Sequence, residues 1–251
     1  MSLLRTEKLR KYFGDTHAVD DVDFSVSEGE FLSLVGSNGA GKTTLVNLVS
    51  AYFPPDGGHI FFQDRDITHA LVADRIKAGI ARSFQLVNLF DDLSAFDNIA
   101  LSIFAREGKT HSLFSVADHD SEVAKEAGDV LGQFGLAAKR ATTAGGLAQG
   151  ERKLLDVAVA YALRPKLLFL DEPTSGVSTR DKAQIMDTVS SVVRAGRITA
   201  VVIEHDMDVV FKYSDRIVVM HEGSILADGS PDEIRQNREV STIFMGAPAA
   251  P

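Results

Sequence analysis

The clearest chemistry lies in a glycine-rich run that ends in lysine and threonine. It fits the pattern G-x-x-x-x-G-K-[ST] of a phosphate-binding loop. Its glycines leave room for backbone N–H groups to converge on phosphate oxygens. Lys42 can then reach the β- and γ-phosphates of a nucleotide, and the Thr43 hydroxyl can ligate Mg²⁺. The predicted loop residues are Gly36, Ser37, Asn38, Gly39, Ala40, Gly41, Lys42, Thr43 and Thr44.

Further polar residues follow apolar runs. Asp171 and Glu172 come after Leu167–Leu170 and are placed to hold Mg²⁺ and to polarise an attacking water. Gln85 ends a predicted strand, and His205 follows the apolar run 199–203. Each of these residues also has an ordinary structural explanation. Asp171 and Glu172 could be a solvated surface pair, Gln85 a solvated amide at a strand end, and His205 a structural histidine.

The elements that position these residues follow from hydrophobic periodicity. Residues 31–35 predict a buried strand ahead of the loop, and apolar spacing from Leu45 to Tyr52 predicts a helix after it. Residues 167–170 and 199–203 predict strands buried on both faces of a parallel sheet. Ligands of open α/β sheets bind at the carboxyl ends of strands. Strands ending near 35, 84, 170 and 203 are therefore predicted to bring the polar residues to one edge.

Other segments are less specific. The first 30 residues predict two strands joined by a turn, where an aromatic side chain could stack on adenine or join a small hydrophobic cluster. Residues 86–118 show little regular period, and a helix is predicted from Asp120. Residues 147–151 sit at a predicted helix start, which suits an anion but also suits an ordinary glycine-rich cap.

Composition narrows the function. The chain has 251 residues and no cysteine, which excludes disulfides and Cys-type metal sites. Its net charge of −9 disfavours a general binder of nucleic acid backbones. The longest apolar run, residues 154–163, is too short to span a bilayer, and the N-terminus lacks the apolar core of a signal peptide. We expect a cytoplasmic protein that meets a membrane only through a protein partner.

Together these motifs resemble the ATP-binding subunit of an ABC transporter over about residues 3–246. The loop resembles the Walker A motif, LLFLDE (167–172) the Walker B strand, and LAQGE (147–151) the signature motif. The resemblance places Gln85 and His205 at the Q-loop and switch positions, and implies that Phe13, rather than Tyr12, stacks on adenine. It implies catalytic roles for Lys42, Glu172 and His205, and Mg²⁺ ligation by Thr43, Gln85 and Asp171. The nucleotide contacts expected in the signature motif are Leu147, Ala148, Gln149 and Gly150.

The resemblance also implies a fold. We expect an α/β P-loop NTPase with a mostly parallel sheet, an N-terminal antiparallel β subdomain and a helical subdomain. The chain would be one ABC ATPase domain over residues 1–251. Its RecA-like core and β subdomain would occupy about 1–85 and 150–251, and its helical subdomain about 86–149.

Several stretches are similar to the branched-chain amino acid importer type within the family, among them Ser83-Phe84-Gln85, Leu113-Phe114 and residues 203–207. The expected cofactors are ATP and Mg²⁺. The expected partners are a second ATPase subunit, identical or paralogous, an integral membrane permease in contact with residues 86–118, and indirectly a periplasmic or extracellular solute-binding protein, but no nucleic acid. The chain would then lie at the cytoplasmic face of the cell membrane.

Alternatives stay open. They are ABC systems for urea, amides, aromatic acids or lipopolysaccharide, a non-transport ABC ATPase, and a small-molecule kinase. Two positions depart from the family pattern. Ala148 replaces the signature serine, and Ser178 stands where many relatives carry aspartate. Without the serine hydroxyl, the signature would lose one hydrogen bond, at a cost of about 0.5–1.5 kcal/mol.

Overall fold

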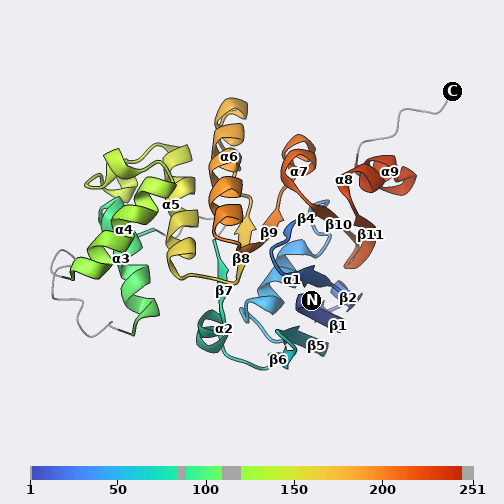
Figure 1. The fold of residues 1–251 in the computed structure, drawn as a ribbon. Coiled ribbons are helices and arrows are strands. Elements are labelled where there is room, and N and C mark those ends of the chain that lie inside the picture. Colours follow the sequence, from blue (N-terminus) through green and yellow to red (C-terminus); the bar gives the residue numbers. More distant parts are fainter. Residues whose placement is uncertain (1, 84–88, 109–119, 245–251) are drawn as a thin grey trace. The chain divides into compact units, whose positions relative to one another are not determined.

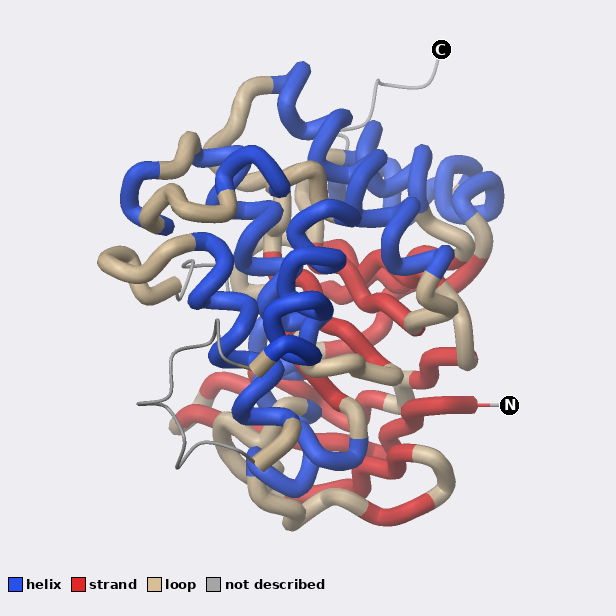
Figure 2. The backbone as a smooth tube through the Cα atoms, turned by 60° about the vertical axis from the view of Figure 1, so that its left-hand side comes forward, coloured by secondary structure: helices blue, strands red, loops and turns tan. Residues whose placement is uncertain are grey.

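The computed structural model describes residues 2–83, 89–108 and 120–244, which form two compact units (Figure 1). The first unit comprises Met1–Arg75 and Thr199–Pro251, and the second comprises Ile76–Ile198. Each unit combines helices with strands, which Figure 2 distinguishes by colour. The chain is therefore a mixed α/β protein, as the sequence predicts.

An antiparallel sheet begins the first unit. Its central strand β1 pairs with β2, β3 and β5, and β5 continues to β6. The register Phe13↔Thr16 closes the β1–β2 hairpin, which confirms the predicted N-terminal turn. The strands are β1 (Ser2–Phe13), β2 (Thr16–Val22), β3 (Ser25–Ser27), β5 (Gly57–Phe62) and β6 (Arg65–Asp66).

A second, mostly parallel sheet continues the first unit. β4 (Phe31–Gly36) lies between β9 (Thr199–Ile203) and β10 (Arg216–His221) and is parallel to both. β11 (Ser224–Gly229) pairs antiparallel with β10. Every residue of β4 and β9 is buried, which explains why their sequences are apolar without alternation.

Helices complete the first unit, and α7 and α8 pack on the sheet through an apolar cluster that includes Val35, Val210, Val219 and Ile234. The last helix was not predicted. Asn237 accepts hydrogen bonds from the N–H groups of Glu239 and Val240, and so caps it. The helices are α1 (Lys42–Val49), α7 (Met207–Tyr213), α8 (Pro231–Gln236) and α9 (Arg238–Phe244); α2 (Val72–Ala78) begins in this unit.

Arg75 of α2 is buried against the end of the loop helix α1. Its guanidinium donates to the carbonyl oxygens of Leu48 and Val49 at 2.6 and 2.7 Å. It also donates to Ile67 and Thr68 at 2.7 and 2.9 Å. Burial lowers the pKa of Arg75 to about 10, so the side chain is still charged at neutral pH. A cation at the C-terminus of α1 satisfies its last carbonyls and complements the helix dipole.

The described residues of the second unit form two parallel strands, four α-helices and the end of α2. β7 (Ile80–Arg82) and β8 (Leu167–Asp171) pair in the register Arg82↔Phe169. The helix predicted from Asp120 is present as α4, and α5 starts within the predicted signature motif. The helices are α3 (Ala95–Arg106), α4 (Ser121–Gln133), α5 (Gln149–Ala162) and α6 (Thr179–Ala195), with short 3-10 turns η3 (Ala137–Lys139) and η4 (Ala144–Gly146).

Helix α3 corrects the interpretation of residues 86–118 as a stretch without regular period. The Ser94 hydroxyl accepts a hydrogen bond from the Asp97 N–H at 3.0 Å, and the Asp97 carboxylate accepts one from the Ser94 N–H. This capping box starts a helix whose buried side chains include Phe96, Ile99 and Ile103. The capping residues and the apolar spacing were both present in the sequence. The polar residues of the helix and of the adjoining loop obscured the helical period of the apolar side chains.

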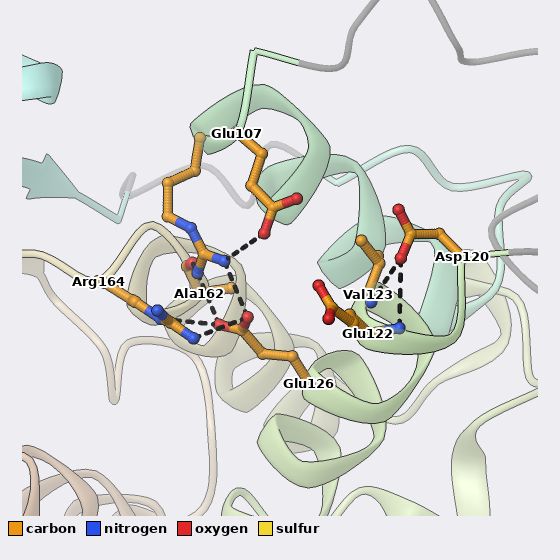
Figure 3. A network of polar contacts seen from close by, with 8 residues as sticks. Glu107, Asp120, Glu122, Val123, Glu126, Ala162 and Arg164 are labelled. Carbon is orange, nitrogen blue, oxygen red and sulfur yellow. Dashed lines mark hydrogen bonds and ion pairs between the residues drawn. The ribbon is translucent and has the colours of Figure 1, made fainter.

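An ion-pair network joins α3, α4 and the end of α5 within the second unit (Figure 3). Arg106 donates to both carboxylate oxygens of Glu126, at 2.6 and 2.8 Å, and to the Ala162 carbonyl at 2.8 Å. Arg164 donates to the same carboxylate at 2.9 and 3.0 Å. The hydrogen bond from Arg106 is the largest cause that lowers the pKa of Glu126 below its usual value. The network fixes the far end of the helix that begins at the signature motif.

Candidate nucleotide-binding and hydrolysis site

The predicted phosphate loop connects the buried strand β4 to helix α1. Two of its glycines are required by close packing. A Cβ on Gly36 would collide with the Met220 carbonyl oxygen of β10, and one on Gly41 with the Ala18 carbonyl oxygen of β2. Gly41 also has a φ of 102°, which a side chain disfavours. The loop therefore depends on glycine for its path between neighbouring strands.

Lys42 and Thr43 are the first residues of α1. The Lys42 ammonium is buried and donates to the carbonyl oxygens of Gly36 and Ser37, at 2.7 and 3.0 Å. These bonds hold the positive charge against the loop. Thr43 is exposed, one position further along the helix. The N–H groups of a helix start and the helix dipole make this position suited to an anion.

The loop is tied to its surroundings through the turn between β10 and β11. The Gly223 N–H donates to the Ala40 carbonyl at 3.1 Å, and the Gly223 carbonyl accepts from the Asp20 N–H at 2.9 Å. The C-terminal hairpin thus connects the phosphate loop to β2. Sequence reasoning gave this turn no role at the site.

His205 lies at the same edge of the sheet as the phosphate loop. β9 is parallel to β4 in the register Leu34↔Ile203, so both strands end there. The exposed His205 follows buried Glu204 and precedes Asp206, which caps α7 through the Asp208 and Val209 N–H groups. Within the first unit, the structure therefore brings His205 and the loop to one edge, as predicted.

Phe13 and Tyr12 differ in their environments. The Tyr12 ring stacks on His17 with centroids 4.2 Å apart, and its hydroxyl donates to Asp20 at 2.7 Å. That hydrogen bond raises the pKa of Tyr12 above its usual value. Phe13 makes an edge contact with Phe53 and keeps 49% of its surface exposed. Phe13 is thus exposed and Tyr12 half-buried, and stacking of Phe13 on adenine stays a prediction.

Asp171 and Glu172 end β8 in the second unit. Asp171 is buried and forms a 2.6 Å ion pair with Arg82 at the end of β7. Glu172 follows with a φ of 49°, in the left-handed region that non-glycine residues rarely adopt.

Lys153 is a site residue that sequence reasoning missed. It is buried in α5, and its ammonium donates to the Ser175 hydroxyl at 3.0 Å and to the Glu172 carbonyl at 3.3 Å. The sequence held a signal, because Lys153 lies four and seven residues before the buried Val157 and Ala160. A charged residue on the buried stripe of a helix needs partners, and Ser175 and Glu172 are two of them.

The signature-like residues form the start of α5. Leu147 is buried, and Ala148 is the N-cap, whose N–H donates to the Glu151 carboxylate at 3.0 Å. Alanine has no side-chain acceptor, so only this half of a capping box is formed. Gln149 lies so close to Gly176 that a Cβ there would collide with its amide. Gly150 follows in the first turn of the helix.

Ser178, the second departure from the family pattern, has a structural role. Its hydroxyl accepts from the Asp181 N–H at 3.2 Å and caps the N-terminus of α6. Aspartate and serine are both strong N-cap residues, so the exchange keeps the helix start. Gln85, the remaining predicted site residue, lies outside the described residues.

Two described residues are suited to the expected metal. Mg²⁺ at nucleotide sites usually takes one or two protein ligands and completes its shell with phosphate and water oxygens. Thr43 offers a hydroxyl and Asp171 a carboxylate, which are hard oxygen donors of this kind. No cluster of three or more acidic, histidine or cysteine side chains that could hold a metal occurs within residues 2–83, 89–108 and 120–244.

A family model for the ABC transporter matches residues 19–175, which include the phosphate loop, the signature-like stretch and both carboxylates. The chain belongs to this family and is an ATP-binding ATPase of the ABC type. In the described part of the chain, no helix is long and apolar enough to cross a membrane.

Several relatives match the chain nearly end to end. The probable branched-chain amino acid transport ATP-binding protein LivG of Methanocaldococcus jannaschii is 33% identical over 98% of each chain. The high-affinity branched-chain amino acid transport ATP-binding protein BraF of Pseudomonas aeruginosa is 32% identical, over 97% of this chain and 98% of its own. The corresponding LivG of Escherichia coli is 31% identical over the same shares.

Solved structures show the same fold. A nucleotide-free ATP-binding cassette from an ABC transporter superposes on the chain with a TM-score of 0.86 at 30% identity. The match covers 98% of this chain and 100% of the solved one. The ADP conformation of an ATP-binding cassette also gives a TM-score of 0.86 at 31% identity, over the same shares. These matches confirm the predicted fold class.

Proposed function

We propose that the chain is the ATP-hydrolysing subunit of an ABC importer that carries branched-chain amino acids, or a closely related small polar solute, through a separate permease. The observation that supports this most directly is the 31–33% identity to LivG and BraF proteins across nearly the whole chain. The phosphate loop, with its buried Lys42, supplies the matching chemistry.

Binding of ATP begins at the loop. The N–H groups of residues 36–44 and the Lys42 ammonium neutralise phosphate charge, while Phe13 stacks on the adenine. Thr43, Asp171 and Gln85 hold Mg²⁺, which would draw negative charge from the β- and γ-phosphates. On binding, the Lys42 ammonium exchanges the Gly36 and Ser37 carbonyls for phosphate oxygens.

Hydrolysis relies on two further side chains. The Glu172 carboxylate accepts a hydrogen bond from the attacking water and polarises it. His205 contacts the γ-phosphate and orients the same water. The meeting of these residues from the two units around one triphosphate is part of the proposal.

A second ATPase subunit, identical or paralogous, completes the site. Leu147, Ala148, Gln149 and Gly150 of one subunit would cap the γ-phosphate bound by the other. The N-terminus of α5 provides backbone N–H groups and a dipole for this purpose. Because Ala148 brings no hydroxyl, backbone groups would make this contact alone.

The permease contact is assigned to residues 86–118 of a helical subdomain at about 86–149. A relative at 26% identity, CbiO1 from Clostridium perfringens, is described as part of an ABC transporter complex. By analogy, the chain would bind at the cytoplasmic face of the membrane, and a solute-binding protein would deliver solute to the permease on the other side.

Uptake by cells that lack the chain tests the proposed solute. We expect loss of labelled leucine, isoleucine and valine uptake, restored by the parent chain but not by Glu172→Gln or Lys42→Ala. Urea and an aromatic acid serve as comparison solutes. Unchanged branched-chain amino acid uptake together with loss of a comparison solute would refute the solute assignment and leave the ATPase assignment in place.

A further inference from the structure

A buried ion pair joins the ends of the parallel strands β7 and β8. The Arg82 Nη2 atom lies 2.6 Å from Asp171 Oδ2, and the two side chains are only 9% and 3% exposed. Arg82 is opposite Phe169 in the strand register, and residues two apart on a strand share a face. Arg82 and Asp171 therefore lie on one face of the strand pair, and the contact is fixed by register rather than by a surface rotamer.

The pair has consequences for a metal at Asp171. The guanidinium is a delocalised cation that binds a carboxylate through its N–H groups. It occupies one carboxylate oxygen, and it repels a divalent ion that approaches the other. A buried carboxylate also needs a counterion when no metal is present, because an uncompensated buried charge is costly. Arg82 supplies that counterion.

We propose that Arg82 competes with Mg²⁺ for Asp171, so that the site takes up Mg²⁺ only together with a nucleotide. The negative charge of the phosphates offsets the guanidinium, and the metal then displaces Arg82 from Asp171 Oδ2. Arg82 is thus a positioning residue that sets the metal affinity of the site. The inference rests on the proposed role of Asp171 in holding Mg²⁺.

The test compares Arg82→Gln with Arg82→Lys. Melting temperature is followed while Mg²⁺ is titrated at saturating ADP, which gives a half-saturating Mg²⁺ concentration without catalysis. Removing one positive charge should lower that concentration by about fivefold or more for Arg82→Gln. Arg82→Lys keeps the charge and should stay within about twofold of the parent. Without nucleotide, added Mg²⁺ should raise the melting temperature of Arg82→Gln but not that of the parent.

A half-saturating Mg²⁺ concentration that is unchanged or higher in Arg82→Gln would overturn the inference, as would an equal fall in Arg82→Lys. In an Asp171→Asn background, Arg82→Gln should no longer alter the Mg²⁺ response. If Arg82→Gln does not fold, a crystal structure of Glu172→Gln with Mg·ATP tests whether Arg82 has left Asp171. Arg82 should then lie beyond hydrogen-bond distance of Asp171 Oδ2, and a retained ion pair would contradict the inference.

These outcomes are separable from the proposed function. A parent chain that ADP does not stabilise would refute nucleotide binding itself. A parent that ADP stabilises, with Arg82→Gln leaving the Mg²⁺ response unchanged, would refute only the role of Arg82.

Discussion

The ammonium of Lys153 lies 3.0 Å from the hydroxyl of Ser175, and it also donates to the carbonyl of Glu172 at 3.3 Å. One buried charge thus links the helix that begins at the signature motif to the turn that carries the proposed water-polarising carboxylate. Because Glu172 has a positive φ, its backbone depends on surrounding contacts to keep this conformation. Lys153 is one of those contacts.

Replacing Lys153 by methionine should slow hydrolysis more than it weakens binding. We expect kcat to fall about tenfold, because a displaced Glu172 positions water less well, while the nucleotide Kd stays within about twofold. Steady-state ATPase assays and titration with a fluorescent nucleotide separate the two effects. Lys153→Arg retains a donor and should recover most of kcat. Equal losses in kcat and affinity would argue against a positioning role.

Glu172→Gln should lower the ATPase rate by about a hundredfold or more, which is the usual range for a general base. The amide keeps the size of the side chain but cannot accept the proton. Nucleotide binding should persist, as shown by an ADP-dependent rise in melting temperature. An unchanged steady-state rate would show that another residue orients the water.

Phe13→Ala should weaken nucleotide binding about tenfold, because stacking on a base contributes about 1–3 kcal/mol. Equilibrium titration with ATP and with a triphosphate that lacks a purine base provides the measurement. Tyr12→Phe is the matched control: it removes only the hydroxyl bound to Asp20 and should leave the affinity within about twofold. A greater loss in Tyr12→Phe than in Phe13→Ala would reverse the assignment.

Ala148→Ser should stabilise the chain. Ala148 is the N-cap of α5 and Glu151 already forms the return half of a capping box, so a serine hydroxyl would complete it. The expected gain is about 1 kcal/mol, or about 2–4 °C in melting temperature for a chain of this size. Ala148→Val, which adds volume without an acceptor, is the control and should give no gain.

The stability contributed by Glu126 should depend on pH. Hydrogen bonds from Arg106 are the main reason that its pKa lies below the usual 4.5. The charged form is therefore favoured in the folded state, and its contribution is present above pH 4.5 and lost as the pH falls through the lowered value. Glu126→Gln should cost about 1 kcal/mol at pH 7.

Thermal melts across pH 3 to 7 check this prediction. The difference between Glu126→Gln and the parent should shrink below pH 4.5. A difference that stays constant with pH would mean that packing, rather than charge, accounts for the cost.

Contiguous stretches carried most of what the sequence predicted correctly. The phosphate loop, the N-terminal hairpin and the buried strands β4, β8 and β9 each depend on neighbouring residues, whose glycines or unbroken apolar runs have few other solutions. Helix α3 also depends on neighbouring residues, because Ser94 and Asp97 form its capping box. It was nevertheless not predicted.

Other features depend on segments distant in the chain. Arg82 and Asp171 are 89 positions apart, and Lys153 and Ser175 are 22 apart. Their contacts follow from strand register and helix packing, which a linear pattern does not encode. The contacts of Tyr12 with His17 and Asp20 are similar, since they form only once β1 and β2 pair. The sequence by itself determined the chemistry and its order along the chain. The tertiary structure alone decided which charges neutralise one another, because only burial makes such pairing necessary.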